Sequence, residues 1–218
     1  MSTFDADYYQ RVYPDYAAQN PPRKLAFYAS LVNRHLPASA PRRLHDVGCA
    51  FGGFLTALGP EWELYGSDLS EFALARARER LPQATFAVAG AGDAPFDQPF
   101  GAVTAFDVIE HVPDLDAVAQ AVTRQLVPGG VLVFVVPVYD GLSGPLIRCL
   151  DKDVTHVHRW PRARWLTWAA EHFEVVEWAG ILRYLVPGVK RYLHVPTHAG
   201  RGHTPAIAVV CRRGGKAG

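Results

Sequence analysis

The sequence has few cysteines and no long hydrophobic run. Its three cysteines, Cys49, Cys149 and Cys211, are odd in number, and none belongs to a CxxC pair. They argue against a disulfide framework and a structural zinc site, and they predict reduced thiols in a cytoplasmic protein. The longest apolar run, Val131–Val136, is far too short to cross a bilayer, so we expect no membrane span.

Neither sign of charge is in excess. The 22 Lys and Arg residues nearly balance the 21 Asp and Glu residues, which leaves a net charge of +1. The sequence also lacks a basic stripe interleaved with aromatic residues, so we expect no nucleic-acid partner and no anionic membrane surface. The opening MSTFDADYYQ has neither a basic segment nor an apolar one, which argues against a secretory signal.

The length and the 49% hydrophobic content predict one globular domain with a full core. Within an N-terminal extension, 1–36, residues 4–36 have a helical pattern that is broken at Asn20-Pro21-Pro22. A second helix is expected over about Arg23–His35. We expect this N-terminal extension either to pack on the domain or to cover a pocket as a lid. Its tyrosines are Tyr8, Tyr9, Tyr13 and Tyr16.

Short apolar runs alternate with helical segments up to Pro137. This alternation is typical of an α/β protein with a doubly wound, mainly parallel sheet and helices on both faces. The runs are apolar at nearly every position, as expected for strands buried on both faces. The expected strands are Arg43–Val47, Glu63–Ser67, Thr85–Ala89, Ala102–Asp107 and Val131–Val136, and the expected helices are Phe51–Leu58, Glu71–Leu81 and Leu115–Leu126.

After Pro137 the regular alternation lapses. Two segments rich in turn-forming residues, 138–162 and 181–205, are expected to be insertions that cover a ligand site. Two further strands bring the expected total to seven. The remaining expected segments are a helix at Arg162–His172, strands at Phe173–Trp178 and Ala206–Cys211, a main domain over 37–212 and a frayed tail at 213–218.

The stretch HDVGCAFGGF places a glycine-rich turn directly after the first expected strand. The spacing Gly48-x-Ala50-x-x-Gly53 is a degraded match to the dinucleotide fingerprint G-x-G-x-x-G. A second interpretation starts at Asp46, whose carboxylate would repel a pyrophosphate and attract an ammonium group. A turn that only packs a helix close to a strand is the third possibility.

Two further aspartates follow later strand ends. Asp68 lies about 20 residues after the loop, where a carboxylate accepts hydrogen bonds from ribose hydroxyls. Its alternative role as a helix cap is better filled by Ser70, which directly precedes the helical run. Asp93, in AGDA, is expected to accept the amino group of adenine, and its alternative is a simple turn aspartate.

Both a NAD site and an S-adenosylmethionine site would use a carboxylate such as Asp68. A hydride-transferring enzyme usually needs a separate substrate domain beside its cofactor domain. About 170 residues follow the glycine loop, and the remaining strands use most of them. The lack of room for a second domain therefore disfavours an NAD(P)-dependent oxidoreductase.

With these residues in place, the chain resembles the class I S-adenosylmethionine-dependent methyltransferases from about Leu44 to Arg212. The resemblance is carried by HDVGCAFGG, YGSDLS, AGDAPF, FDVIEHV and LVPGGVLVF. It implies a seven-stranded sheet whose last strand is antiparallel, with S-adenosyl-L-methionine as the cofactor. The residues that it places at the cofactor are Asp46, Gly48, Gly52, Asp68, Leu69, Asp93, Ala94, Phe106 and Asp107.

One loop residue departs from the family pattern. Ala50 stands where a middle glycine is often found, and alanine disfavours a positive φ. The geometry of the turn is therefore left open.

The segment DVIEH resembles the small-molecule O-methyltransferase branch, including the ubiquinone-biosynthesis enzymes. Some of those carry an acidic-x-x-Glu-His pattern that is proposed to hold a divalent ion. Asp107, Glu110 and His111 would share one face of a helix start, and such ligands suit Mg²⁺ or Zn²⁺. We favour the alternative in which Glu110 and His111 shape the pocket or cap the helix, so no metal is expected.

A hydroxyl acceptor needs a general base, and histidine suits that task near neutral pH. His156 and His158 stand in DKDVTHVHRW, and on an extended segment their rings point to opposite sides. We expect His156 to be the base, with Asp153 orienting it and with His111 as a further candidate.

These features predict methyl transfer from S-adenosyl-L-methionine to a small-molecule acceptor, expected at a hydroxyl oxygen. Nucleic-acid methylation is disfavoured, because FDVIEH occupies the place of an Asn/Asp-Pro-Pro-Tyr/Phe tetrapeptide. The alternatives that stay open are a compact NAD(P)-dependent oxidoreductase and a cofactor-binding module without catalysis.

Overall fold

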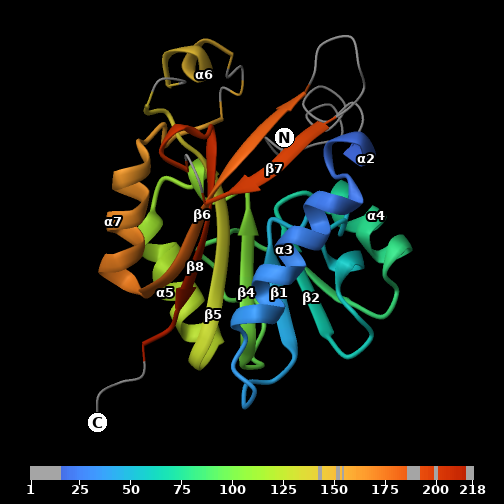
Figure 1. Cartoon of the computed structure of the whole chain (residues 1–218). Coiled ribbons are helices and arrows are strands. Elements are labelled where there is room, and N and C mark those ends of the chain that lie inside the picture. Colours follow the sequence, from blue (N-terminus) through green and yellow to red (C-terminus); the bar gives the residue numbers. More distant parts are fainter. Residues whose placement is uncertain are drawn as a thin grey trace.

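The computed structural model describes residues 16–141, 144–150, 153, 155–185, 192–198 and 201–214. Eight strands form one sheet in the order β3-β2-β1-β4-β5-β8-β6-β7 (Figure 1). The strands are β1 Arg43–Val47, β2 Glu63–Asp68, β3 Thr85–Val88, β4 Phe100–Phe106, β5 Leu126–Pro137, β6 Glu174–Leu185, β7 Tyr192–Thr197 and β8 Ala206–Arg212. The helices are α2 Tyr16–Gln19, α3 Pro22–His35, α4 Glu71–Arg80, α5 Leu115–Gln125, α6 Gly144–Leu150 and α7 Arg162–His172, with 3-10 turns at η1 Leu55–Ala57, η2 Ile109–His111 and η3 Arg201–His203.

The sheet has the expected doubly wound form. Strands β1 to β5 pair in parallel, and β8 runs antiparallel to both β5 and β6. Helix α3 covers one face, and α5 and α7 cover the other (Figure 1). The α/β class and the antiparallel final strand are therefore confirmed.

The predicted count of seven strands is wrong, because β7 pairs antiparallel with β6 at the end of the sheet. This strand lies within 181–205, which was expected to be loop, and it contains Pro196. A proline is tolerated on an edge strand, where one side of the backbone needs no partner. Strand β6 is also longer than Phe173–Trp178, because it extends to Leu185 to pair with β7.

Strand β5 shows why the apolar runs had to be nearly continuous. Its odd-numbered residues Val131, Val133 and Val135 pack in the core under α3. Its even-numbered residues Leu132 and Phe134 pack in the core under α5 and α7. Successive side chains of a strand point to opposite faces, so burial on both faces requires apolar residues at both parities.

The expected helix over Phe51–Leu58 is wrong for most of its length. Only the 3-10 turn η1 forms there, because Gly52 adopts a φ of +69°, which ends any regular helix at that point. By contrast, α4 begins where it was predicted. Ser70 caps it by accepting a hydrogen bond from the backbone N–H of Ala73 at 3.3 Å.

Several further predictions concern segments outside the sheet, the cysteines and membrane spans. Tyr8, Tyr9 and Tyr13 lie outside the described residues, as does most of the tail. Helix α6 forms within 138–162, near the carboxyl-terminal edge of the sheet (Figure 1). Cys49 and Cys211 are buried free thiols. No helix in the described part of the chain has the length and apolarity needed to cross a membrane.

Candidate active site

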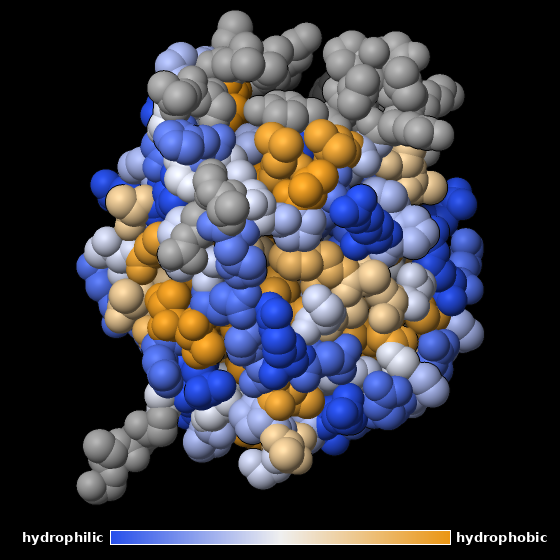
Figure 2. All heavy atoms as spheres, viewed as in Figure 1, coloured by the Kyte–Doolittle hydropathy of each residue, from blue (hydrophilic) through white to orange (hydrophobic). Residues whose placement is uncertain are grey.

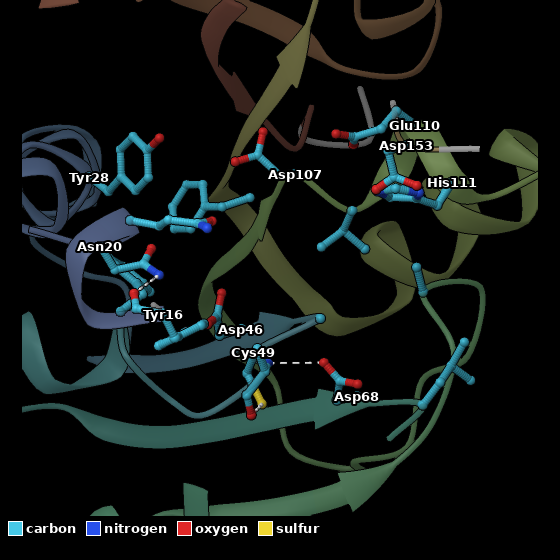
Figure 3. A pocket seen from close by; sticks show the side chains of 18 of the residues that line it. Tyr16, Asn20, Tyr28, Asp46, Cys49, Asp68, Asp107, Glu110, His111 and Asp153 are labelled. Atoms are coloured by element: carbon cyan, nitrogen blue, oxygen red, sulfur yellow. Dashed lines mark hydrogen bonds between the residues drawn. The ribbon is translucent and has the colours of Figure 1, made fainter. Parts of the chain in front are cut away.

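A cavity of about 360 Å³ opens at the carboxyl ends of β1, β2 and β4. Figure 3 shows Asp46, Asp68 and Asp107 around it, with Tyr28 on one side and His111 on the opposite side. Helix α3 and the β6–β7 hairpin complete its walls. The expected residues that line it are Asp46, Gly48, Asp68, Leu69, Phe106, Asp107, Glu110, His111, Asp153 and His156.

The glycine loop after β1 alternates through left-handed conformations. Gly48, Ala50 and Gly52 have φ values of +68°, +48° and +69°. A Cβ atom at Gly48 would lie 2.3 Å from Val108 Cγ2, so this position excludes any side chain. Ala50 adopts the positive φ despite its methyl group, at a cost of about 1–2 kcal/mol. The backbone at Ala50 thus has the conformation that a glycine at this position would allow.

Asp68 holds that turn against the start of α4. Its Oδ2 accepts a hydrogen bond from the backbone N–H of Ala50, and its Oδ1 accepts one from that of Ser70, both at 2.9 Å. Asp68 also lines the cavity, and a carboxylate oxygen can accept more than one hydrogen bond. Asp68 therefore combines a structural task with an acceptor surface on the cavity.

Asp46 is a buried carboxyl, with 3% of its surface exposed. Its Oδ1 accepts a hydrogen bond from the Thr104 hydroxyl at 2.7 Å, and its Oδ2 has no partner within the described residues. Burial raises the pKa of Asp46 to about 7, with a further contribution from the charge of Asp68 and an opposing one from Thr104. A cationic group in the cavity would favour the ionised form.

Three expected cofactor residues do not line the cavity. Gly52 shapes the turn, since its N–H donates to the Cys49 carbonyl at 2.9 Å. Asp93 is exposed, and its Oδ2 accepts a hydrogen bond from the Gly90 N–H at 2.8 Å. Asp93 thus closes a turn, and its neighbours Ala89, Gly90 and Ala91 line the cavity in its place, while Ala94 also lies outside the lining.

Asp107 is held in place by a residue that sequence reasoning missed. Its φ is +57°, and its Oδ1 accepts a hydrogen bond from Arg183 Nη1 at 2.5 Å. Burial raises the pKa of this carboxyl, but the charges of Arg183 and Lys24 outweigh burial and hold the pKa below its usual value. Arg183 was assigned to a loop. A lone arginine within the apolar run GILRYL of a strand is the signal that could have identified it.

The β6–β7 hairpin has two different faces. Arg183 and its cross-strand partner His194 share one face, and Arg183 lines the cavity. Leu182 and Leu193 alternate with them and are each 38% exposed. Figure 2 shows apolar side chains gathered on the outer surface over this hairpin. The period of two along a strand therefore explains how one hairpin supplies both a cavity wall and an apolar surface.

Four neighbouring residues lie on the other side of the cavity, and we call them the histidine cluster: His111, Asp153, Thr155 and His156. The Thr155 hydroxyl lies 2.5 Å from Asp153 Oδ1 and 2.9 Å from His111 Nδ1. His156 Nδ1 lies 2.9 Å from the Tyr139 hydroxyl, and the two histidine rings are 4.6 Å apart between centroids. His158 turns away from the cavity and pairs with the Val112 carbonyl.

Glu110 lies beside this cluster and is 1% exposed. Neither of its carboxyl oxygens has a hydrogen-bond partner among the residues that the structure describes. Burial, together with the charge of Asp107, raises the pKa of Glu110 well above its usual value.

Ligand atoms of Glu110, His111 and His156 lie within 4.8 Å of one another, which is close enough to hold a metal ion. The set that was considered from the sequence contained Asp107 in place of His156. The structure commits Asp107 to Arg183, so it assembles a different group.

A family profile described as a methyltransferase domain matches residues 16–177. The chain belongs to the class I S-adenosylmethionine-dependent methyltransferases. S-adenosylmethionine is the cofactor of this family, and the resemblance drawn from the sequence motifs is confirmed. The ubiquinone-biosynthesis branch is only one of several groups among its relatives.

Two curated relatives illustrate the range of methyltransferases to which the chain is similar. The trans-aconitate 2-methyltransferase of Variovorax paradoxus is 36% identical over 106 residues, which are 47% of this chain and 41% of that protein. The ubiquinone biosynthesis O-methyltransferase of Methylococcus capsulatus is 40% identical over 103 residues, which are 44% of this chain and 43% of that protein. The chain therefore matches less than half the length of each relative.

Solved structures support the fold. A methyltransferase from Thermotoga maritima, described as a possible histamine N-methyltransferase, superposes with a TM-score of 0.67 at 15% identity and covers 94% of this chain and 97% of that one. A putative methyltransferase from Bacillus halodurans has the same TM-score at 18% identity, covering 86% of this chain and 99% of that one.

Proposed function

We propose that this chain transfers a methyl group from S-adenosylmethionine to a hydroxyl oxygen of a small molecule. The observation that supports this most directly is that one cavity joins the glycine loop to the histidine cluster. Cofactor-binding carboxylates and a candidate proton acceptor are thus present in a single site.

The residues of the cavity fit the cofactor. The buried carboxylate of Asp46 has an oxygen without a protein partner, which suits the ammonium group of the methionine moiety. The carboxylate of Asp68 lines the cavity at the end of β2, where a carboxylate accepts hydrogen bonds from ribose hydroxyls. Leu69 and Ala89–Ala91 offer an apolar wall for the adenine ring.

The cofactor, when bound, supplies a methyl group that is activated by its attachment to a sulfonium. The tasks left to the protein are to align the acceptor, to exclude water and to remove the proton of the hydroxyl. Helix α3, the segment around His156 and the β6–β7 hairpin would cover the site. In this proposal the main domain, 37–212, binds the acceptor on the side of the cavity that is covered by the N-terminal extension and by the insertions 138–162 and 181–205.

Geometry favours His111 as the proton acceptor, with Asp153 acting on it through Thr155. The Thr155 hydroxyl has one proton, and at 2.5 Å it donates that proton to the Asp153 carboxylate. His111 must then donate its Nδ1 proton to Thr155 Oγ1, so the lone pair of the neutral ring lies on Nε2. This tautomer is the one that a general base requires.

The electrostatics of the cluster support the same assignment. Burial lowers the pKa of His111, and His156 lowers it further, so the ring is neutral at physiological pH. Burial raises the pKa of Asp153, but the hydrogen bonds from Thr155 and the charges of the histidines hold it below its usual value. An ionised Asp153 would stabilise the imidazolium of His111 as it forms.

His156 was the histidine favoured from the sequence. It lines the same cavity and pairs with Tyr139, whose hydroxyl can either donate or accept. We assign His156 the task of contacting the acceptor beside His111.

Two names among the relatives support an oxygen acceptor. One relative is named for methylation of trans-aconitate and another as an O-methyltransferase of ubiquinone biosynthesis. A carboxylate acceptor needs no base, whereas a phenol or alcohol does. The presence of the histidine cluster favours the hydroxyl.

A turnover assay tests the proposal. The purified protein is incubated with S-adenosylmethionine and a panel of phenols, alcohols, amines and trans-aconitate, and formation of S-adenosylhomocysteine is measured. We expect turnover with a hydroxyl compound and a loss of about 100-fold or more in His111→Ala. Turnover only with amines or carboxylic acids would overturn the hydroxyl assignment, and S-adenosylhomocysteine binding without any turnover would favour a non-catalytic module.

A further inference from the structure

Helix α3 presents a buried ammonium group to the cavity. Lys24 lines the cavity and is only 7% exposed. Its Nζ donates one long hydrogen bond, of 3.4 Å, to the Gln19 carbonyl, and it forms no ion pair among the described residues. The ring centroids of Tyr28 and Tyr192 lie 5.9 Å and 5.0 Å from Nζ. A buried charge without a counter-ion is costly, so it calls for a ligand that compensates it.

The nearby acids do not supply that counter-ion. The carboxylate of Asp107 is engaged by the guanidinium of Arg183, and these two charges offset each other. Burial and the charge of Asp107 raise the pKa of Glu110, which disfavours its ionised form. Burial lowers the pKa of Lys24 to about 8, so its amine is still mostly charged at neutral pH. This end of the cavity therefore has one uncompensated positive charge.

A second donor stands one helical turn further along. Tyr28 follows Lys24 by four residues, so both side chains are on the same face of α3. Its ring stacks on Phe106 at 4.3 Å between centroids, and its buried hydroxyl has no hydrogen-bond partner in the described structure. Figure 3 shows Tyr28 on the side of the cavity opposite His111. An unsatisfied buried hydroxyl beside an unpaired ammonium group is a pair of donors that lacks an acceptor.

We propose that Lys24 and Tyr28 form a carboxylate-binding site in the cavity. A carboxylate has one negative charge and two acceptor oxygens, which match one ammonium group and one hydroxyl. Building on the proposed function, the carboxylate has two possible sources: the methionine moiety of the cofactor, or a carboxyl group on the acceptor.

Calorimetric titration of four proteins tests the site: wild type, Lys24→Met, Tyr28→Phe and the control Arg23→Gln. Arg23 is the neighbour of Lys24 on the same helix, and it is exposed, so the control removes an equal charge outside the cavity. The ligands are S-adenosylhomocysteine, 5′-methylthioadenosine, which lacks the amino-acid group, and citrate, a small polycarboxylate. Citrate is titrated with and without saturating S-adenosylhomocysteine.

If the cofactor supplies the carboxylate, Lys24→Met weakens S-adenosylhomocysteine binding about 10- to 100-fold and Tyr28→Phe weakens it by about 10-fold. Binding of 5′-methylthioadenosine stays unchanged in both variants. If the acceptor supplies it, both nucleosides bind normally and citrate binding is lost in Lys24→Met. The control Arg23→Gln matches wild type in either case.

Unchanged binding of both S-adenosylhomocysteine and citrate in Lys24→Met would overturn the site. Equal weakening of 5′-methylthioadenosine would also overturn it, because that ligand has no carboxylate. A wild-type protein that binds neither nucleoside would count against the proposed cofactor use, and the citrate titration would still report on the site.

Stability without ligand gives a second readout. Tyr28→Phe retains the stacked ring and removes an unsatisfied hydroxyl, so its thermal midpoint should equal or exceed that of wild type. A variant that is more stable yet binds the carboxylate more weakly separates a ligand contact from a structural role. A lower midpoint in Tyr28→Phe would contradict the unpartnered state of the hydroxyl on which the site rests.

Discussion

The backbone N–H of Ala50 donates a hydrogen bond to the carboxylate of Asp68 at 2.9 Å, and Ala50 has a φ of +48°. The second strand thus holds the loop of the first strand in a conformation that alanine disfavours. The turn expected of a glycine is therefore present without the glycine.

Ala50→Gly should stabilise the protein by about 0.5–1 kcal/mol. Relief of the left-handed strain is worth about 1–2 kcal/mol, and the greater freedom of glycine in the unfolded chain offsets part of it. Denaturant unfolding measures the difference. The control Ala75→Gly, at an exposed position within α4, should lose about 1 kcal/mol. If both variants lose stability equally, the strain at Ala50 is not real.

Much of the fold follows from hydrophobic patterning. The bounds Arg43–Val47 were predicted as the structure has them, because this segment lies between Pro41 and the glycine-rich turn that begins at Gly48. Strand β7 was missed, since its proline and histidine resemble a loop and only pairing with β6 makes it a strand. The helix predicted over Phe51–Leu58 was wrong for the opposite reason. The apolar spacing of this segment is typical of a helix, but the positive φ of Gly52 prevents one.

Some residues of the site could likewise be predicted from the sequence, and others could not. Asp46, Asp68 and Asp107 could be predicted because each lies at or directly beside the carboxyl end of a strand, where ligands of such sheets bind. Lys24 and Arg183 could not, because they come from α3 and β6 and reach the cavity only through tertiary packing. The link from Asp153 to His111 through Thr155 depends on side-chain geometry, which spacing alone does not specify.

Asp46→Asn should raise the free energy of unfolding by about 2–4 kcal/mol at pH 8. The folded carboxyl has a pKa of about 7 and the ordinary value is 3.8, so unfolding releases its proton between these values. Stability is therefore lost as the pH rises through this window, and the penalty is complete above it. The gain of the variant should shrink toward pH 4, as measured by urea unfolding at several pH values. A gain that is independent of pH would contradict the raised pKa.

Thr155→Val should lower kcat by about 10- to 100-fold while leaving the fold intact. Valine removes the Thr155 hydroxyl oxygen, which lies 2.9 Å from His111 Nδ1 and accepts its proton in the proposed tautomer. The imidazolium of His111 loses this acceptor, so the acidic limb of the pH–rate profile should move to lower pH. Thr155→Ser retains the hydroxyl and should restore both properties. An unmoved acidic limb in Thr155→Val would remove His111 from the role of base.

Turnover should survive treatment with EDTA. Thr155 engages His111 Nδ1, so a metal ion at Glu110, His111 and His156 would have to take His111 Nε2, the nitrogen that we propose as the base. Activity is measured before and after chelation and after addition of Mg²⁺ or Zn²⁺. A loss that either ion restores would assign Glu110, His111 and His156 to a metal site instead.

The central claim is that the cavity binds S-adenosylmethionine through the loop and carboxylates around it. Isothermal titration of S-adenosylhomocysteine into wild type and Asp68→Ala tests this most directly, with NAD as the competing ligand. We expect micromolar binding of S-adenosylhomocysteine, none of NAD, and an affinity at least about tenfold weaker in Asp68→Ala. Binding of NAD without S-adenosylhomocysteine, or an unchanged affinity in Asp68→Ala, would contradict this claim.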